Sequence, residues 1–529
     1  MDFNKVLVHA KASIIKLTIG NYTMQKTKTI MVQGTTSDAG KTILVAGLCR
    51  WLAQRDINVV PFKPQNMALN SAVSVDGGEI GRAQALQAKA CFLAPHTDMN
   101  PVLIKPSSDT NAQIIIHGHA LKNMDAKHFH DYKKIAMSAV LESHTRLEKN
   151  YQMVVVEGAG SPAEVNLREN DIANMGFAEA VDCPVILIAD IDRGGVFAHI
   201  VGTLSCLSQS EQDRIVGFVI NRFRGDIALL QSGLDWLEEK TGKPVLAVLP
   251  YLQNFYLDAE DSIHGQQSST KDNNPFTIVV PVLGRISNHT DFDTLKLNPN
   301  IHLIFAAPGQ SLPNADLIIL PGSKNVRADL KKLKQHGWQH DITRHLRYGG
   351  KVFGICGGYQ ILGNVIHDPQ GIEDQPGSEI GLGLLRCETT ITENKTLKHV
   401  SGEFCNTHFQ STNVRGYEIH AGITHGDDCV HALINIASSE EKTISSAEEK
   451  PTEVSYNDGA TNREGTVAGT YLHGIFDTEE ATTSILTWAG YNKKNTAIDL
   501  DAHRETQLNR LADTLDKHVN KEFLANLLA

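Results

Sequence analysis

The chain has 529 residues, of which 41% are hydrophobic, 21% are charged and 6% are aromatic, a balance that excludes a mainly disordered protein. The net charge of −11 argues against a nucleic-acid or anionic-membrane partner, because either would favour a basic surface. The eight cysteines include no CxxC pair, so they indicate neither a disulfide framework nor a zinc site. A reducing cytoplasm fits this cysteine usage, and no apolar run is long enough to predict a transmembrane helix.

The first structural feature along the chain is an N-terminal segment without regular patterning. Residues 1–29 contain only short apolar runs, interrupted by charged residues, and no signal-peptide cleavage pattern follows them. We therefore expect a disordered extension there.

Residues 30–257 alternate short β-branched runs with helical stretches. Continuous apolar strands of this kind are typical of parallel strands that are buried on both faces. The alternation predicts an α/β domain with a doubly wound parallel sheet. The predicted strands include residues 30–33, 59–60, 153–156, 185–188, 215–220 and 245–249.

A second α/β series follows. Residues 258–275 are polar and predict a linker, and residues 276–490 predict a second α/β domain. The polar stretch 437–464 predicts a surface insertion in that domain, and residues 491–529 predict a helical tail from their leucine spacing. The predicted strands of the second domain include residues 276–280, 303–305, 317–320, 351–355 and 467–472.

A glycine-rich turn follows the first predicted strand and precedes a helix, as a phosphate-binding loop does. Backbone N–H groups in such a loop turn towards phosphate oxygens, and the helix N-terminus adds a favourable dipole. Lys41 would reach the β- and γ-phosphates of ATP, and the Thr42 hydroxyl would bind Mg²⁺. Five residues, rather than the usual four, separate the two glycines. The predicted ATP-binding loop comprises Gly34, Thr35, Thr36, Ser37, Asp38, Ala39, Gly40, Lys41 and Thr42.

Two further polar residues end predicted strands of the first domain. Glu157 is placed to bind Mg²⁺ directly or through water, since ligands bind at the carboxyl edge of open α/β sheets. A solvated glutamate is the alternative interpretation. Asn221 is placed to contact an adenine edge, although a plain turn asparagine fits nearly as well.

Cys356 lies between a predicted strand and a predicted helix, in the small-residue context of a nucleophile elbow. The helix N-terminus would favour its thiolate form. A buried structural cysteine is the alternative, but the flanking glycines are hard to explain that way. His473 is the best candidate base among 23 histidines, because it follows a late strand and precedes a turn. The N–H groups of Gly322 (or the next residue) and Gly357 are candidate oxyanion donors.

These motifs together resemble a known family. The segment around Cys356 and the Tyr-Leu-His-Gly stretch around His473 are similar to class I glutamine amidotransferase domains of the cobyric acid synthase subgroup. The phosphate loop resembles that of the dethiobiotin synthetase-like ATPases, which share its spacing with the same family. The resemblance covers about residues 30–490 and implies a flavodoxin-like fold for the second domain. Other segments similar to the family are residues 63–67, 285–293, 320–324 and 416–420.

The resemblance implies a glutamine-hydrolysing, ATP- and Mg²⁺-dependent amide ligase. Cys356 would attack the amide of L-glutamine, with His473 moving the proton, and the released ammonia would attack an acyl phosphate made from ATP. The implied substrate is a corrinoid, adenosylcobyrinic acid a,c-diamide, amidated at its b, d, e and g carboxylates to adenosylcobyric acid during cobalamin biosynthesis. Lys63 is a candidate contact for phosphate or a substrate carboxylate.

One departure from the wider amidotransferase pattern concerns His473. Most triad enzymes have a glutamate two residues later, but Ile475 occupies that position here. The cobyric acid synthase family is likewise described as using cysteine and histidine alone, so the group that orients His473 is unassigned. The sequence also assigns no oligomeric state, ammonia path or corrinoid contacts.

Two alternative functions stay open at this point. A related ligase could amidate another polycarboxylate, such as cobyrinic acid at a and c or a cell-wall precursor. A ParA/MinD-like nucleotide switch is disfavoured, because it usually has an early second lysine where this loop has Thr35 and Thr36.

Overall fold

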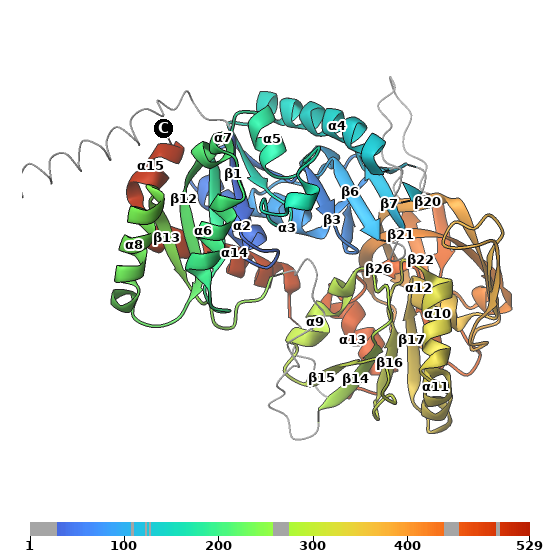
Figure 1. Ribbon diagram of the computed structural model, residues 1–529. Coiled ribbons are helices and arrows are strands. Elements are labelled where there is room, and N and C mark those ends of the chain that lie inside the picture. Colours follow the sequence, from blue (N-terminus) through green and yellow to red (C-terminus); the bar gives the residue numbers. More distant parts are fainter. Residues whose placement is uncertain are drawn as a thin grey trace, which may run out of the picture.

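A computed structural model describes residues 29–106, 111–121, 124–125, 129–257, 275–438, 454–492 and 498–528. Two α/β halves lie beside each other, and the C-terminal end of the chain returns to the first half (Figure 1). The predicted extension 1–29 and linker 258–275 lie outside the described residues except for one residue each. None of the described helices is both long and apolar enough to cross a membrane.

The first half is built on a six-stranded parallel sheet among the described residues, in the order β13-β12-β11-β1-β10-β2. The predicted doubly wound parallel sheet is therefore confirmed. Strand β1 lies between β10 and β11, so the residues that follow β1 and β10 meet at one edge of the sheet. The strands are β1 (Thr29–Gly34), β2 (Val59–Phe62), β10 (Met153–Glu157), β11 (Val185–Asp190), β12 (Ile215–Phe223) and β13 (Val245–Pro250).

Helices cover both faces of this sheet because its strands are apolar on both sides. Alternate residues of β1 point to opposite faces, so Val32 packs in one core cluster and Met31 in the other. The first face holds α2 (Lys41–Ala53), α14 (Leu500–His518) and α15 (Lys521–Leu528). The opposite face holds α4 (Phe129–Asn150), α5 (Met175–Ala180), α6 (Val196–Ser205) and α8 (Gln231–Thr241), and α7 (Gln209–Arg214) precedes β12.

The C-terminal tail is helical as predicted, and it packs along α2 of the first half. A Cβ at Gly47 would lie only 2.9 Å from Leu515 Cδ1, so the two helices approach closely. The buried Arg50 guanidinium forms an ion pair with Glu505 at 2.7 Å, and Trp51 Nε1 donates to Asp516 at 3.0 Å. Leucines at helical spacing in α14 therefore complete the core beneath the parallel sheet.

Smaller sheets extend the first half towards the second (Figure 1). Strands β6 and β7 pair antiparallel, β3 joins β6 in parallel, and β4 and β5 form a separate hairpin. Helix α3 (Arg82–Ala90) follows the hairpin directly. The strands are β3 (Gln65–Met67), β4 (Ser71–Val73), β5 (Glu79–Gly81), β6 (Val102–Pro106), β7 (Asn111–Ile116), β8 (His119–Ala120) and β9 (Met124–Asp125).

The second half contains a six-stranded sheet in the order β15-β14-β16-β17-β25-β24, in which all pairs except β24 with β25 are parallel. Its strands are β14 (Phe276–Pro281), β15 (Ile301–Ala306), β16 (Leu317–Leu320), β17 (Lys351–Ile355), β24 (Ala460–Thr461) and β25 (Val467–Thr470). The helices of this half are α9 (Asp293–Leu297), α10 (Val326–Gln335), α11 (Trp338–Arg347), α12 (Gly357–Leu362) and α13 (Glu479–Trp488).

A second, mostly antiparallel sheet lies on the side of this half that faces β6 and β7 (Figure 1). Its long central pair, β20 with β21, carries residues towards the first half. The strands are β18 (Val365–Asp368), β19 (Gly377–Ile380), β20 (Cys387–Phe404), β21 (Asn413–Gly426), β22 (Ile434–Ser438), β23 (Val454–Asp458) and β26 (Leu472–His473).

The polar stretch 437–464 is not an insertion over its whole length. Its described ends belong to β22, β23 and β24, and residues 439–453 lie outside the described residues. Polar and apolar positions alternate in β22, where Ile434 and Ile436 are buried and Asn435 and Ala437 are exposed, so the polar content of this stretch does not exclude strands. The predicted strand 467–472 likewise divides into β25 and β26, which belong to different sheets.

The docked tail generates a first prediction. Leu515→Ala removes a side chain that is 2% exposed against α2, so we expect it to lower the free energy of unfolding by about 2–5 kcal/mol. Leu528→Ala removes a side chain that is 42% exposed, and its effect should stay within about 0.5 kcal/mol. Urea denaturation of both variants measures the difference, and equal effects would contradict the proposed packing.

Candidate functional site

The predicted phosphate loop joins the end of β1 to the start of α2. Gly40, which precedes the helix, has φ +103°, a conformation that favours glycine. The Lys41 ammonium donates to the carbonyl oxygens of Thr36 at 3.1 Å, Ser37 at 3.0 Å and Gly160 at 2.9 Å. Lys41 thus spans the loop and the segment that follows β10, the arrangement expected where a phosphate chain would lie.

Glu157, at the end of β10, is fully buried and lies beside this loop. Its carboxylate accepts from the Thr42 hydroxyl at 2.8 Å, from the Lys63 ammonium at 3.0 Å and from Gln87 Nε2 at 2.5 Å. The structure therefore brings together the two predicted Mg²⁺ ligands, Thr42 and Glu157. It also places Lys63, the candidate substrate contact, in an ion pair with Glu157.

The donor set at Thr42 and Glu157 fits Mg²⁺, because both groups offer hard oxygen atoms at the start of α2. No group of three or more His, Cys, Asp or Glu side chains with the geometry of a metal site occurs among the described residues. A Mg²⁺ ion held by these two residues would complete its coordination with phosphate oxygens and water, as Mg²⁺ commonly does.

Asn221 contacts the phosphate loop itself. Its Nδ2 donates to the Ala39 carbonyl at 3.0 Å, and its Oδ1 accepts from the Arg222 backbone N–H at 2.9 Å. Beside it, Arg222 pairs with Asp190 at 2.7 Å, and Arg193 pairs with Asp38 of the loop at 3.0 Å. The asparagine therefore supports the loop, and its contact with an adenine edge stays a prediction.

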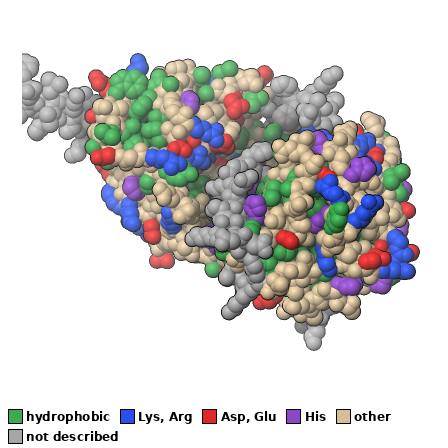
Figure 2. Space-filling model, turned by 90° about the horizontal axis from the view of Figure 1, so that it is seen from below, with side chains coloured by type: hydrophobic (Ala, Val, Ile, Leu, Met, Phe, Trp, Pro, Cys, Tyr) green, Lys and Arg blue, Asp and Glu red, His purple; other side chains and the backbone are tan. Residues whose placement is uncertain are grey.

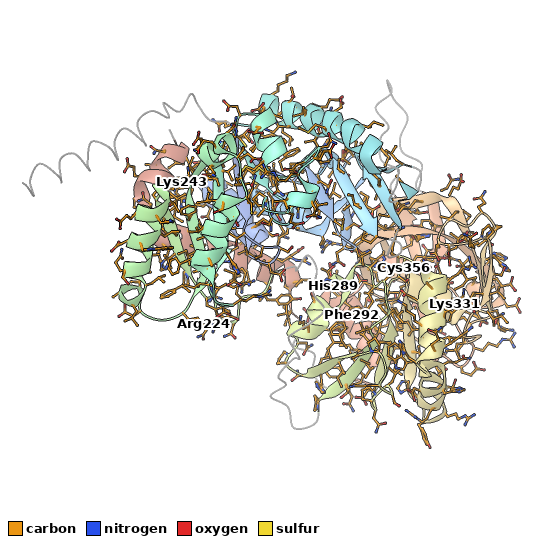
Figure 3. All side chains as sticks on the ribbon, in the orientation of Figure 1. Arg224, Lys243, His289, Phe292, Lys331 and Cys356 are labelled. Atoms are coloured by element: carbon orange, nitrogen blue, oxygen red, sulfur yellow. The ribbon has the colours of Figure 1, made fainter. Side chains whose placement is uncertain are left out.

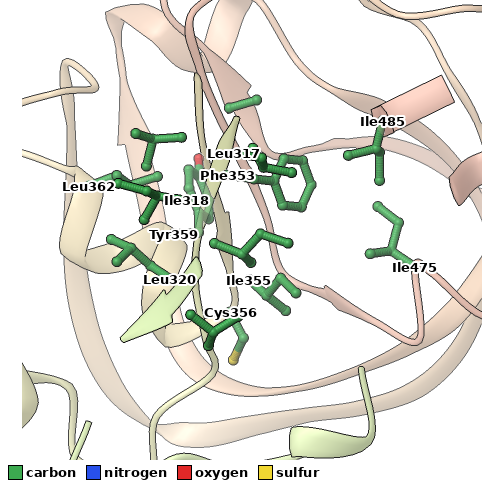
Figure 4. Close-up of a cluster of buried hydrophobic side chains, with 14 of the residues drawn as sticks. Leu317, Ile318, Leu320, Phe353, Ile355, Cys356, Tyr359, Leu362, Ile475 and Ile485 are labelled. Atoms are coloured by element: carbon green, nitrogen blue, oxygen red, sulfur yellow. The ribbon is translucent and has the colours of Figure 1, made fainter. Parts of the chain in front are cut away.

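Cys356 occupies the predicted elbow in the second half. It joins β17 to α12 with φ 50° and ψ −106°, a strained backbone for a residue with a side chain. Glycines surround it because the turn is tight, and a Cβ at Gly354 would lie 2.7 Å from the Tyr359 nitrogen. Figure 4 shows the sulfur at the edge of the apolar cluster, and the thiol donates to the Ile419 carbonyl at 3.7 Å.

His473, on β26, is fully buried, and its orienting group is Asp291. The His473 Nδ1–H donates to Asp291 Oδ2 at 2.8 Å, and the backbone N–H of Gly474 donates to the other carboxylate oxygen at 2.8 Å. Sequence reasoning left this group unassigned. The segment 285–293, which contains Asp291 and resembles the family, was the part of the sequence that could have indicated this group.

The surroundings of His473 favour its charged form. Burial alone would lower its pKa, but Asp291 and Cys356 outweigh burial and raise the pKa of His473 to about 10. The ring stacks on Tyr417 with centroids 5.5 Å apart. Cys356 and His473 therefore interact electrostatically, and Asp291 fixes the ring. The roles of the thiol as nucleophile and of the imidazole as base stay predictions.

Gly322 and Gly357, the glycines predicted to donate to an oxyanion, lie beside His473 and Cys356. A Cβ at Gly322 would lie 2.8 Å from His473 Cε1, and a Cβ at Gly357 would lie 2.7 Å from the Ser323 nitrogen. The Gly322 carbonyl accepts from the Ser287 N–H at 3.0 Å, which fixes this turn against the segment that carries Asp291. The donation of their N–H groups to an oxyanion stays a prediction.

The first half contacts the segment that carries the orienting carboxylate. Asn288 Oδ1 accepts from the Ser71 N–H at 3.0 Å, and Asn70 Oδ1 accepts from the His289 N–H at 3.0 Å. Figure 3 shows His289 and Cys356 on the side of the second half that faces the first. The cysteine–histidine site therefore lies at the boundary between the two halves.

Comparison with known families agrees with this arrangement. A family model for the CobQ/CobB/MinD/ParA nucleotide binding domain matches residues 30–263, and one for the CobB/CobQ-like glutamine amidotransferase domain matches residues 277–481. The chain has the architecture of the cobyric acid synthase family. Its two domains support a glutamine-dependent amidation enzyme of this type, and from here they are called the synthetase and glutaminase domains.

Solved structures give a more distant similarity. A chain of PurLQS from Thermotoga maritima is 18% identical, covers 41% of this chain and 99% of its own length, and has a TM-score of 0.29. A chain of a glutamine amidotransferase is 14% identical, covers 40% of this chain and 99% of its own length, and has the same TM-score of 0.29.

The carboxylate beside His473 generates the second prediction. Asp291→Asn keeps the size of the side chain but removes the charge that favours the imidazolium and selects its tautomer. We expect glutamate release from glutamine to fall by about 10²–10⁴-fold in kcat. Asp427→Asn, at an exposed residue that pairs with Arg386, is the control and should leave kcat unchanged. An unchanged rate in Asp291→Asn would contradict the positioning role.

Proposed function

We propose that this protein is a cobyric acid synthase that amidates the b, d, e and g carboxylates of adenosylcobyrinic acid a,c-diamide. The observation that carries the proposal is the presence, in one chain, of a phosphate loop with Lys41 and a buried Cys356–His473–Asp291 arrangement. The segments around 63–67, 285–293 and 416–420 support the choice of this family member over other ligases.

In the glutaminase domain, the Cys356 sulfur attacks the side-chain amide carbon of glutamine. The imidazolium form of His473 gives its Nε2 proton to the departing ammonia, and the neutral ring then takes a proton from the water that hydrolyses the thioester to glutamate. Asp291 holds the ring throughout. The backbone N–H groups near Gly322 and Gly357 would stabilise the oxyanion.

In the synthetase domain, a substrate carboxylate oxygen attacks the γ-phosphorus of ATP, the bond to the β,γ-bridging oxygen breaks, and ADP leaves as the acyl phosphate forms. Ammonia then displaces phosphate from the acyl carbon and forms the amide. Lys41 would stabilise the negative charge that develops on the γ-phosphate. Mg²⁺, held by Thr42 and Glu157, would neutralise charge on the phosphate oxygens.

Two alternatives differ from this proposal in their substrates. A related ligase would amidate another polycarboxylate, such as cobyrinic acid at a and c or a cell-wall precursor. A ParA/MinD-like switch would hydrolyse nucleotide without forming an amide, and the complete glutaminase constellation disfavours it.

Separating the two sites gives the third prediction. Cys356→Ala should abolish corrinoid amidation with glutamine but retain it with ammonium at raised pH, because free ammonia bypasses the thioester. Lys41→Ala should abolish amidation with either nitrogen source, since no acyl phosphate forms. Product formation is measured for each variant with both nitrogen sources. Loss of both activities in folded Cys356→Ala, or an ammonium reaction in Lys41→Ala, would contradict this division of labour.

The choice of substrate is tested by mass spectrometry of the corrinoid after incubation with ATP, Mg²⁺ and glutamine. Cobyrinic acid and the a,c-diamide are compared under the same conditions. We expect four successive carboxyl-to-amide mass changes with the a,c-diamide. Amidation of cobyrinic acid alone would favour the related ligase, and nucleotide hydrolysis without any amide would favour the switch.

A further inference from the structure

Two lysines from different domains pair with one carboxylate where the domains meet, and a third lysine interacts with them electrostatically. Glu79 of β5 is 1% exposed, and one of its oxygens accepts from Lys105 of β6 at 2.6 Å. Its other oxygen accepts from Lys395 of β20, in the glutaminase domain. Lys105 is itself 2% exposed and also donates to the Ser71 hydroxyl at 2.9 Å.

Lys324 brings the third ammonium group from the glutaminase domain. It lies two residues after Gly322, is partly exposed, and donates to Gln113 Oε1 of the synthetase domain at 3.0 Å. Gln113 stands directly opposite Lys105 in the β6–β7 pair, so the contact brings Lys324 towards the other two lysines. We call Lys105, Lys324 and Lys395 the interface lysines.

Three lysines face two carboxylates here, those of Glu79 and Glu373, together with the sulfur of Cys356 when its thiol is ionised. Glu79 accepts from two of the lysines with its two oxygens. Glu373 acts electrostatically on Lys324 and accepts from the backbone N–H groups of Val326 and Arg327. Burial, Lys395 and Lys105 together lower the pKa of Lys324 to about 7, although both glutamates oppose this shift. Below about pH 7, and with Cys356 protonated or acylated, the ammonium groups outnumber the negative charges, and this excess favours a bound anion.

Two of the interface lysines, Lys105 and Lys324, are linked to the surroundings of Cys356. A negative charge at Cys356 opposes the lowering of the Lys105 pKa that burial causes, so the two groups interact electrostatically. The backbone of Ser323, next to Lys324, packs directly on Gly357 beside the thiol. An anion bound by these lysines would therefore lie close to a group attached to the Cys356 sulfur.

We propose that the interface lysines bind the α-carboxylate of L-glutamine, so that both domains build the glutamine site. This proposal rests on the proposed function, which makes glutamine the substrate of Cys356. Glutamine carries its amide and its α-carboxylate at opposite ends of one short chain, so a molecule attacked by Cys356 presents a carboxylate to nearby cations. Lys105 then makes the synthetase domain part of the donor site.

The test compares L-glutamine with L-glutamine α-amide, which has the same side-chain amide but no α-carboxylate. Glutamate or isoglutamine release gives kcat and KM for each compound. In Lys324→Gln we expect the KM for glutamine to rise about tenfold, the cost of losing one charge-assisted contact, with kcat nearly unchanged. The kcat and KM for the α-amide should be the same in Lys324→Gln as in the protein without substitutions.

Two further variants keep the test specific. Lys324→Arg retains the positive charge and should restore most of the preference for glutamine over its α-amide. Lys331→Gln, on the exposed face of α10, removes a lysine of the same domain and should change neither substrate.

The pH dependence of the preference for glutamine over its α-amide is a readout that a purely structural role of Lys324 would not change. The charged form of Lys324 binds the carboxylate and is lost as pH rises through about 7, so the preference for glutamine should fall above that pH. Lys395, Lys105, Glu79 and Glu373 are the charged groups that face Lys324, and Lys324→Gln should remove this pH dependence.

An equal rise of KM for both compounds in Lys324→Gln, or an unchanged preference for glutamine, would overturn the proposal. If the protein without substitutions hydrolyses glutamine but Lys324→Gln does not show the expected loss of preference, only the carboxylate site is refuted. An unchanged protein that releases no glutamate under any condition would refute the proposed function together with it.

Discussion

The hydrogen bond between Asp291 and His473 is the interaction on which the glutaminase site depends. It buries a carboxylate and an imidazole together, both at most 1% exposed, and only their mutual charge makes such burial stable. The carboxylate comes from the segment after β14, and the histidine comes from β26, far along the chain. The site therefore requires the whole glutaminase domain to be folded.

The same interaction places the site at the domain boundary. Just before Asp291, the His289 N–H donates to the Asn70 side chain, and the Asn288 side chain accepts from the Ser71 N–H at the start of the β4–β5 hairpin. Tyr417, which stacks on His473, packs with Val73 of that hairpin. The synthetase domain thus supports the ring and the carboxylate of the glutaminase without contributing either.

The hairpin also leads to the nucleotide site. Helix α3 begins directly after β5, and its Gln87 donates to Glu157 beside the phosphate loop. One short stretch of chain therefore contacts both sites, with Glu79 at the interface lysines and Gln87 at the predicted magnesium ligands. Charged side chains elsewhere are more dispersed: on the face in Figure 2, basic and acidic side chains are interspersed over both halves.

Local patterns made much of this architecture predictable. Parallel buried strands, the loop ending at Thr42 and the elbow at Cys356 each depend on short-range rules, namely apolar runs, glycine turns and a strand that leads into a helix. The fold class and the family followed from these signals. The helical spacing of Leu508 and Leu511 likewise predicted a terminal helix, but not that it would pack on α2.

The remaining features depend on tertiary contacts that no local pattern reveals. Asp291 and His473 are 182 positions apart, and no sequence pattern around either residue indicates that they are in contact. Lys105 and Lys395 look like ordinary charged residues in the sequence, and they share Glu79 only because two domains meet there. Lys63 is predicted from the sequence to contact phosphate or a substrate carboxylate. Its ion pair with Glu157 could not be predicted, because that contact depends on the register of β2 beside β10.

The synthetase domain supports the Asp291–His473 pair through the contact of Asn70 with His289. The most direct measurement is glutamate release by Asn70→Ala, which removes the side-chain acceptor of the His289 N–H and touches neither Cys356 nor the phosphate loop. We expect a fall of about 2–10-fold in glutaminase kcat, the effect of one lost hydrogen bond, while synthesis from ammonium continues unchanged. An unchanged glutaminase kcat, or an equal loss of the ammonium reaction, would contradict it.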